Sequence, residues 1–214
     1  MTYKTIKADG KSEEEIKKSR FICYLKRITD EQEARDFIAQ IKKEHYKANH
    51  SCSAMIIGNQ SQIKRSSDDG EPSGTAGLPM LSVLEKQELT NLVAVVTRYF
   101  GGTKLGTGGL IRAYSGAVAK ALSAVGLVEV KELEGLEISL TYSQYQIWAN
   151  FLQQEGLQEA ETEFLDSVKT HIYLESENLN RVLSRLTDFY SGQFSYQKIG
   201  RRLLELPFNS GLSE

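Results

Sequence analysis

The sequence is poor in the residues that cross-link a fold or bind metal ions. Its 214 residues include two cysteines, three histidines, three prolines and one tryptophan. The two cysteines, Cys23 and Cys52, form no CxxC pair, which excludes a disulfide framework and argues against structural zinc. No apolar run approaches the ~20 residues that cross a bilayer, and the first thirty residues contain no signal-peptide core. We therefore expect a cytoplasmic protein with reduced thiols and no membrane contact.

The charge is close to zero overall but is divided unequally along the chain. Residues 1–131 carry 20 Lys and Arg against 15 Asp and Glu, a net charge of +5, whereas residues 132–214 carry −7. Opposite signs in the two halves favour two modules, the first better suited to an anionic partner. The value of +5 is modest for a nucleic-acid-binding module.

Hydrophobic periodicity predicts an α+β fold in the first half. Alternating or continuous apolar runs predict strands, and i, i+3, i+4, i+7 spacing predicts helices. Thr29 and Gln32 have the spacing of a capping box at the start of one helix. The predicted strands are 19–28, 50–58, 62–67 and 91–100, and the predicted helices are 29–45, a segment introduced by Thr75 and Pro79, and 110–125.

The second half predicts a succession of elements with a known arrangement. Strands over 133–142, 157–165, 167–175 and 192–200 alternate with helices over 143–154 and 178–191 in the order β-α-β-β-α-β, which is ferredoxin-like. We place the boundary near Lys131, which gives domains 1–131 and 132–214. A small acidic module of this kind favours docking of protein partners over catalysis.

A glycine-rich loop between a predicted strand and a predicted helix is the strongest candidate site. Helix N-termini present unpaired N–H groups and the positive end of the dipole, and glycines let backbone approach an anion. The loop matches neither a Walker A loop nor a dinucleotide fingerprint. A tight strand-to-helix connection is the alternative interpretation. The candidate anion or nucleic-acid ligands are Arg98, Gly101, Gly102, Lys104, Gly106, Gly108, Gly109 and Arg112.

The turn "DDGEPSGTAGLP" forms a second candidate. Its carboxylates Asp68, Asp69 and Glu71 suit either a hydrated Mg²⁺ or turn formation with local hydrogen bonds, and we assign no metal. His50 and Cys52 lie two residues apart on a predicted strand and so share a face. A buried, inert cysteine is the commoner case, so we assign no catalytic residue and expect His50 to face a ligand. The other residues of the candidate turn are Gly70, Gly74, Thr75 and Gly77.

The run "DDGEPSGTAGLPML" followed by "VVTRYFGGTKLGTGGLIRAY" resembles the signature of the IMPACT protein family. "SRFICYL", "ANHSCSAMIIG" and the predicted β-α-β-β-α-β tail fit its bacterial branch, so the resemblance covers nearly the whole chain. It implies a first domain similar to domain IV of elongation factor G, with helices on one face of a sheet, and a ferredoxin-like second domain. Eukaryotic relatives act in translational control largely through an additional RWD domain. Because this sequence starts almost directly with the IMPACT-type domain, we expect that role not to transfer.

Three functions are compatible with these observations. The first is a translation-associated protein that binds RNA or the ribosome through an anion-accepting surface faced by Arg98, Lys104, His50 and the 68–71 turn. The second is a protein–protein adaptor, in which the glycines serve the fold alone. The third is an enzyme that acts on a small phosphorylated substrate, with a loop loosely similar to that of GHMP kinases. We rank them in this order and expect no cofactor.

Overall fold

The computed structural model describes residues 2–208 and divides the chain into two compact units. The chain up to Val130 and the end of the last strand, from Glu205, form the first unit, and Lys131–Leu204 forms the second. The sequence predicts a second domain over 132–214, but in the structure the last strand leaves the second unit at Glu205 and joins the first unit. There Phe208 packs against the core of the first unit.

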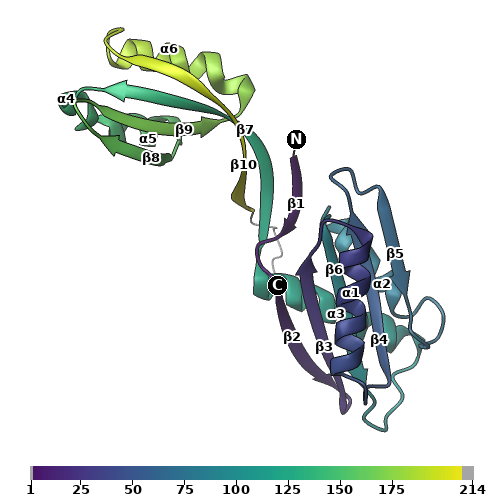
Figure 1. Ribbon diagram of the computed structural model, residues 1–214. Helices are drawn as coiled ribbons and strands as arrows, with labels where there is room; N and C mark the ends of the chain where they lie inside the picture. The colour runs from purple at the N-terminus through teal and green to yellow at the C-terminus, as the bar shows by residue number, and fades with distance from the viewer. Residues whose placement is uncertain (1, 209–214) are drawn as a thin grey trace. The chain divides into compact units, whose positions relative to one another are not determined.

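The first unit contains a five-stranded antiparallel sheet in the order β2-β3-β6-β4-β5 (Figure 1). The central strand β6 is buried along almost its whole length, as its continuous β-branched sequence predicts. Two strands were not predicted, β1 and the charged strand β2. The bounds are β1 Thr2–Ile6, β2 Gly10–Ile16, β3 Ser19–Arg27, β4 His50–Ile57, β5 Ile63–Ser67 and β6 Leu92–Tyr99.

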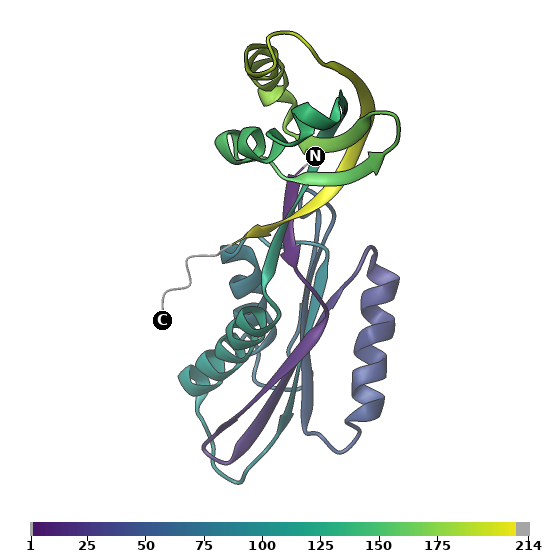
Figure 2. The ribbon, with the colours of Figure 1, turned by 90° about the vertical axis from the view of Figure 1, so that its left-hand side faces the viewer.

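Helices cover both faces of this sheet, which corrects the expectation of helices on one face (Figure 2). Helix α1 (Glu31–Glu44) packs over one face, where its buried residues join Val93 and Val95 in one cluster. Helices α2 (Gly77–Lys86) and α3 (Thr107–Val125) pack over the other face. The cause is the alternation of side chains along β6, which buries apolar residues on both faces.

The start of α1 lies one residue later than the predicted capping box. Asp30 is the N-cap, and its carboxylate accepts a hydrogen bond from the N–H of Glu33 at 2.9 Å. The N–H of Thr29 donates to the Glu33 carboxylate instead of Thr29 capping the helix. Aspartate is as good an N-cap as threonine, so the sequence alone does not distinguish Thr29 from Asp30 as the capping residue.

The second unit has the element order β-α-β-β-α-β, and its strands lie in the order β10-β7-β9-β8. One apolar face of its sheet packs against α5 and α6 around Trp148, Phe151 and Val182. The predicted helix 143–154 is divided into two short helices. The bounds are β7 Leu127–Leu140, α4 Tyr142–Tyr145, α5 Trp148–Glu155, β8 Glu159–Phe164, β9 Val168–Leu174, α6 Leu179–Phe189 and β10 Ser195–Phe208.

Across residues 2–208, every helix is too short or too polar to cross a membrane.

Candidate functional site

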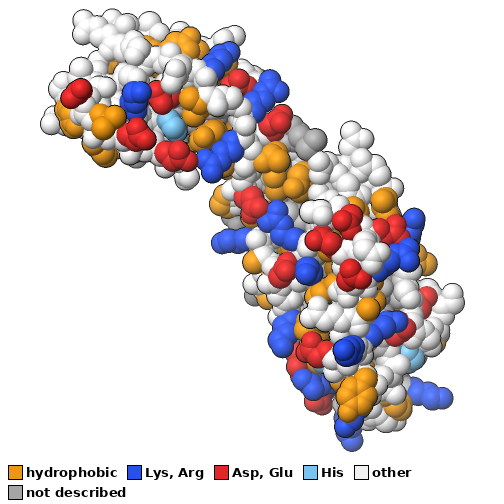
Figure 3. Space-filling model, in the orientation of Figure 1, with side chains coloured by type: hydrophobic (Ala, Val, Ile, Leu, Met, Phe, Trp, Pro, Cys, Tyr) orange, Lys and Arg blue, Asp and Glu red, His pale blue; other side chains and the backbone are white. Residues whose placement is uncertain are grey.

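One end of the first unit's sheet gathers the segments that the sequence singled out. The register places His50, at the start of β4, opposite Arg98, near the end of β6. The turn between β2 and β3 and the loops 68–76 and 100–106 leave the sheet at this end, the lower end of the unit in Figure 1. Figure 3 shows Lys and Arg side chains beside hydrophobic ones there.

Arg98 is buried rather than exposed on this surface. Its guanidinium lies 2.7 Å from the Glu71 carboxylate, and the two residues are 5% and 8% exposed. The hydroxyl of Tyr114 on α3 donates to the same carboxylate at 2.8 Å. The guanidinium also lies 5.5 Å from the ring centroids of Phe21 and Phe100. The positive charge of Arg98 is therefore already compensated within the fold, which corrects its expected role as a surface ligand for an anion.

The three neighbouring carboxylates of the candidate turn have separate partners. Asp68 accepts hydrogen bonds from the N–H groups of Gly74, Ala76 and Gly77, and so binds the start of α2. Burial opposes ionisation of Asp68, but these three N–H groups outweigh it and lower its pKa. Asp69 accepts bonds from the Ser51 N–H and the Lys42 ammonium, each at 2.6 Å, while Glu71 pairs with Arg98.

This arrangement serves the fold of the turn and offers no shared metal site. Among the described residues, no group of three or more His, Cys, Asp or Glu side chains is placed to hold a metal ion. Gly77 is required because a Cβ there would lie 2.7 Å from the backbone nitrogen of Ser67. Thr75 donates its hydroxyl to the carbonyl of Pro72, and Gly70 and Gly74 adopt positive φ angles.

His50 faces the candidate turn and the buried carboxylate of Glu71. Its Nδ1 lies 2.9 Å from the carbonyl oxygen of Asp69, and because a carbonyl only accepts, Nδ1 carries the hydrogen. Its Nε2 lies 3.8 Å from Glu71. Cys52 is buried, its thiol contacts the Asp68 carbonyl at 3.0 Å, and burial raises its pKa to about 12. The thiol therefore stays protonated at neutral pH, which disfavours its use as a nucleophile.

The glycines of the loop 100–106 and of the first turn of α3 have different causes. Gly101 is required by packing, because a Cβ there would lie 1.9 Å from the Lys18 carbonyl oxygen, and Gly109 packs close to Leu105. Gly102 and Gly106 have positive φ angles. Gly108 is exposed, and the nearest atom to a Cβ at that position is the Arg112 guanidinium at 3.7 Å. The fold therefore does not require a glycine at position 108.

The N-terminus of α3 also differs from the starts of the other two helices of the unit. Asp30 caps α1 and Asp68 binds the start of α2 through backbone N–H groups. Helix α3 follows Gly106, with no side-chain cap and no acidic residue in its first turn within the described chain. The charged side chains that are exposed at this point, Lys104 and Arg112, are both basic. Because helix N-termini favour negative charge, this one is electrostatically suited to an external anion.

Sequence reasoning missed the polar residues that fix the loops. The Ser19 hydroxyl contacts the Arg98 guanidinium at 3.4 Å and accepts a bond from the Gly101 N–H at 3.2 Å. The Asn49 side chain accepts a bond from the Phe100 N–H at 2.8 Å. In the sequence, Asn49 and Ser19 are recognisable only as polar residues at the start of strands. The folded structure shows that both contact the loop 100–106.

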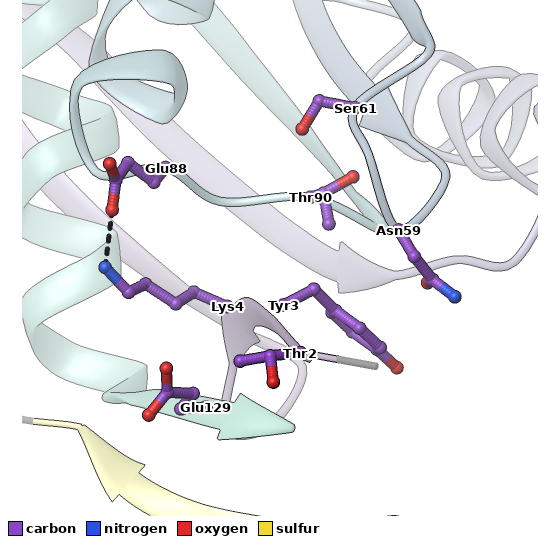
Figure 4. Close-up of a pocket in the computed structure, with 8 residues that line it drawn as sticks. All are labelled: Thr2, Tyr3, Lys4, Asn59, Ser61, Glu88, Thr90 and Glu129. Atoms are coloured by element: carbon purple, nitrogen blue, oxygen red, sulfur yellow. Dashed lines mark hydrogen bonds and ion pairs between the residues drawn. The ribbon is translucent and has the colours of Figure 1, made fainter. Parts of the chain in front are cut away.

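A separate cavity of about 190 Å³ contains none of the predicted site residues (Figure 4). Lys4 and Glu88 form an ion pair at its wall. The residues that line it are Thr2, Tyr3, Lys4, Asn59, Ser61, Glu88, Thr90 and Glu129.

Comparisons with known proteins agree with the resemblance seen in the sequence. Residues 17–122 match the Impact N-terminal domain, and residues 138–193 match a domain of unknown function, DUF1949. The chain is 44% identical over 192 residues to the IMPACT family member YvyE of Bacillus subtilis, covering 90% of this chain and 88% of that protein. It is 49% identical over 111 residues to the IMPACT family member YigZ of Escherichia coli, covering 51% of this chain and 54% of that protein.

A solved structure also matches along nearly the whole chain. It is described as the crystal structure of a hypothetical protein, with 34% identity, a TM-score of 0.59 and coverage of 92% of this chain and 97% of that one. The chain therefore belongs to the IMPACT family, as its signature runs indicate. All the predicted site residues, from His50 to Arg112, lie within the Impact N-terminal domain.

Proposed function

We propose that this protein is a cytoplasmic, translation-associated binding protein that contacts RNA or the ribosome at the N-terminus of α3. The observation that carries the proposal is the contrast among the three helix starts of the first unit. Two are occupied by aspartate from within the chain, whereas that of α3 is flanked by the exposed basic residues Lys104 and Arg112. A phosphate group would supply the missing negative charge.

Gly108 supports the same surface. A glycine in the first turn of a helix weakens the helix, and here no packing contact requires it. Its exposed backbone leaves room for a phosphate oxygen to approach the first N–H groups of α3. The resemblance of the two halves to domain IV and the ferredoxin-like domains of elongation factor G makes ribosomal RNA the preferred source of that phosphate, by analogy of fold.

Ribosome co-sedimentation from lysate at low and high salt tests this proposal. Wild type should pellet with ribosomes at low salt and be released as salt rises, because phosphate contacts are coupled to counterion release. The variant Lys104→Ala/Arg112→Ala should pellet much less. Lys64→Ala/Lys86→Ala is the matched control, since it removes two exposed charges at the opposite end of the sheet. Failure of wild type to pellet at low salt would overturn the proposal.

A protein–protein adaptor is the second candidate, and the second unit provides the observation that favours it. Tyr142, Phe164 and Leu165 are 50%, 55% and 63% exposed, and the rings of Tyr142 and Phe164 stack at 6.5 Å. The Tyr142 hydroxyl donates to the Leu165 carbonyl, which fixes this patch. Glu163 and Asp166 flank it, so it suits a partner segment with apolar and basic residues.

Substitution of the patch distinguishes the adaptor from the RNA-binding function. Under the adaptor hypothesis, Phe164→Ser/Leu165→Ser should abolish ribosome or protein capture, and Lys104→Ala/Arg112→Ala should leave it intact. The reverse result would favour RNA binding. The enzyme alternative has less support. The carboxylates that would bind its Mg²⁺, those of Asp68, Asp69 and Glu71, already bind N–H groups, Lys42 and Arg98, respectively.

A further inference from the structure

The turn between β2 and β3 has an unusual backbone conformation for its sequence. Ile16 pairs with Ser19, so Lys17 and Lys18 form a two-residue hairpin loop. Both have positive φ angles, 47° and 66°, as a type I′ turn requires. Asn-Gly is the favoured pair in this turn, whereas lysine is disfavoured in the left-handed region. Two adjacent lysines therefore occupy a turn that their backbone preferences oppose. Replacing them with the favoured Asn-Gly pair would remove two positive charges.

This turn packs directly against the start of the glycine-rich loop. A Cβ on Gly101 would lie 1.9 Å from the Lys18 carbonyl oxygen, so the two backbones are in close contact. Ser19 joins them through its hydrogen bond with the Gly101 N–H. Both lysine side chains are exposed. The fold thus adds two positive charges to the loop from a part of the sequence that no motif singled out.

Phe100, the residue before Gly101, projects an aromatic ring at the same place. It is 45% exposed, at the end of the predicted strand 91–100. Its N–H is held by the Asn49 side chain, and the Arg98 guanidinium lies 5.5 Å from its ring centroid. Arg98 is in turn fixed by the buried Glu71 carboxylate. The ring is therefore supported by a buried cation and partly open to solvent, the arrangement of an aromatic platform for a stacked base.

From these contacts we infer that Lys17, Lys18 and Phe100 bind an unpaired nucleotide segment of RNA, with the base stacked on Phe100 and flanking phosphates on the two lysines. This rests on the proposed RNA-binding function and specifies its ligand as single-stranded. A duplex keeps its bases stacked internally and offers mainly phosphates and 2′-hydroxyls to this surface, whereas bases of a single strand can turn outward onto an aromatic ring. The recognition is tolerant of sequence, because every base has a π face.

The first test compares the binding of an unstructured RNA strand of about 12 nucleotides with that of its blunt duplex, by fluorescence anisotropy. Phe100→Ala should weaken binding of the strand about tenfold and leave binding of the duplex unchanged. Phe100→Tyr should bind the strand like wild type. Phe100→Leu keeps apolar volume without a π face and should resemble Phe100→Ala, which separates stacking from folding.

The second test uses a variant that should fold better and bind worse. Lys17→Asn/Lys18→Gly supplies the pair that a type I′ turn prefers, so its melting temperature should equal or exceed that of wild type. Its affinity for the strand should fall, and the slope of log affinity against log salt should become shallower by about 0.7 for each lost phosphate contact.

The two proposals fail in different ways. If Phe100→Ala weakens strand and duplex equally or neither, or Lys17→Asn/Lys18→Gly binds like wild type, the single-strand inference is wrong. The proposed function would still stand if Lys104→Ala/Arg112→Ala prevented ribosome pelleting. If wild type neither pellets with ribosomes nor binds either RNA, both proposals are wrong.

Discussion

The guanidinium of Arg98 lies 2.7 Å from the carboxylate of Glu71, and both side chains are almost completely buried. Arg98 belongs to the central strand β6, Glu71 to the loop before α2, and Tyr114, which donates to Glu71, to α3. The ion pair therefore fixes the candidate turn and α3 against the end of the sheet. The exposed residues of the proposed RNA surface depend on it for their positions, although neither Arg98 nor Glu71 can itself reach a ligand in solvent.

Loss of this ion pair should strongly destabilise the protein. Arg98→Ala leaves the Glu71 charge buried without its partner, which costs about 3–5 kcal/mol of unfolding free energy. Urea denaturation should show this decrease. Arg35→Ala is the matched control, because its ion pair with Glu31 is exposed at the arginine and should contribute little to the free energy of unfolding. A decrease for Arg98→Ala no larger than that of the control would contradict the structural role assigned here.

Asp68 should make the stability of the first unit depend on pH in the acid range. Its pKa is lowered in the folded state, so its contribution is complete above the unfolded-state value near 4 and disappears as pH falls through the folded-state value. Asp68→Asn should therefore cost about 1–2 kcal/mol at pH 7, because its hydrogen bonds to the three N–H groups lose their charge, with a smaller difference from wild type near pH 2. Urea unfolding at the two pH values measures this, with exposed Asp36→Asn as the control. A difference independent of pH would rule out the charge as its source.

Both thiols should be inert in the folded protein. Burial raises the pKa of Cys52 to about 12 and that of Cys23 as well. At pH 8 only about one Cys52 in ten thousand is then a thiolate, the reactive form. A maleimide should label neither cysteine of the native protein within minutes and both in urea. Rapid native labelling of Cys52 alone would indicate a reactive thiol at the candidate site.

The sequence predicted the elements with strong periodicity and missed those that depend on tertiary contacts. Strand β6 and helix α3 are confirmed because a continuous β-branched run and a clear apolar stripe leave few alternatives. Strand β2 was missed since its segment "GKSEEEI" is mostly charged, and Lys-Lys is not a recognisable hairpin turn. Its position is set by pairing with β3, which local preference does not encode.

The sequence predicted that the candidate segments would lie together, but not the contacts of the individual residues. The sequence placed the turn 68–77 and the loop 100–106 among the functional candidates. The strand register places His50 opposite Arg98, as expected if these residues face the same surface. The sequence could not show that Arg98 is neutralised, because the partner Glu71 is 27 residues away and its choice depends on how two loops fold. Nor could it show that Phe100 is exposed, since an aromatic residue at a strand end suits either environment.

Gly101 and Gly108 should respond in opposite ways to the same substitution. Gly101→Ala places a Cβ 1.9 Å from the Lys18 carbonyl oxygen and must displace backbone, so it should lower the melting temperature or prevent folding. Gly108→Ala adds a Cβ that makes only an ordinary van der Waals contact with the Arg112 guanidinium at 3.7 Å, so it should stabilise the fold by up to about 1 kcal/mol, as alanine has the higher helix propensity. If Gly108 is present so that a phosphate can approach α3, this more stable variant should pellet less with ribosomes. Thermal unfolding and co-sedimentation of the same samples measure both effects. Unchanged pelleting of Gly108→Ala would show that the first turn of α3 does not contact the ligand.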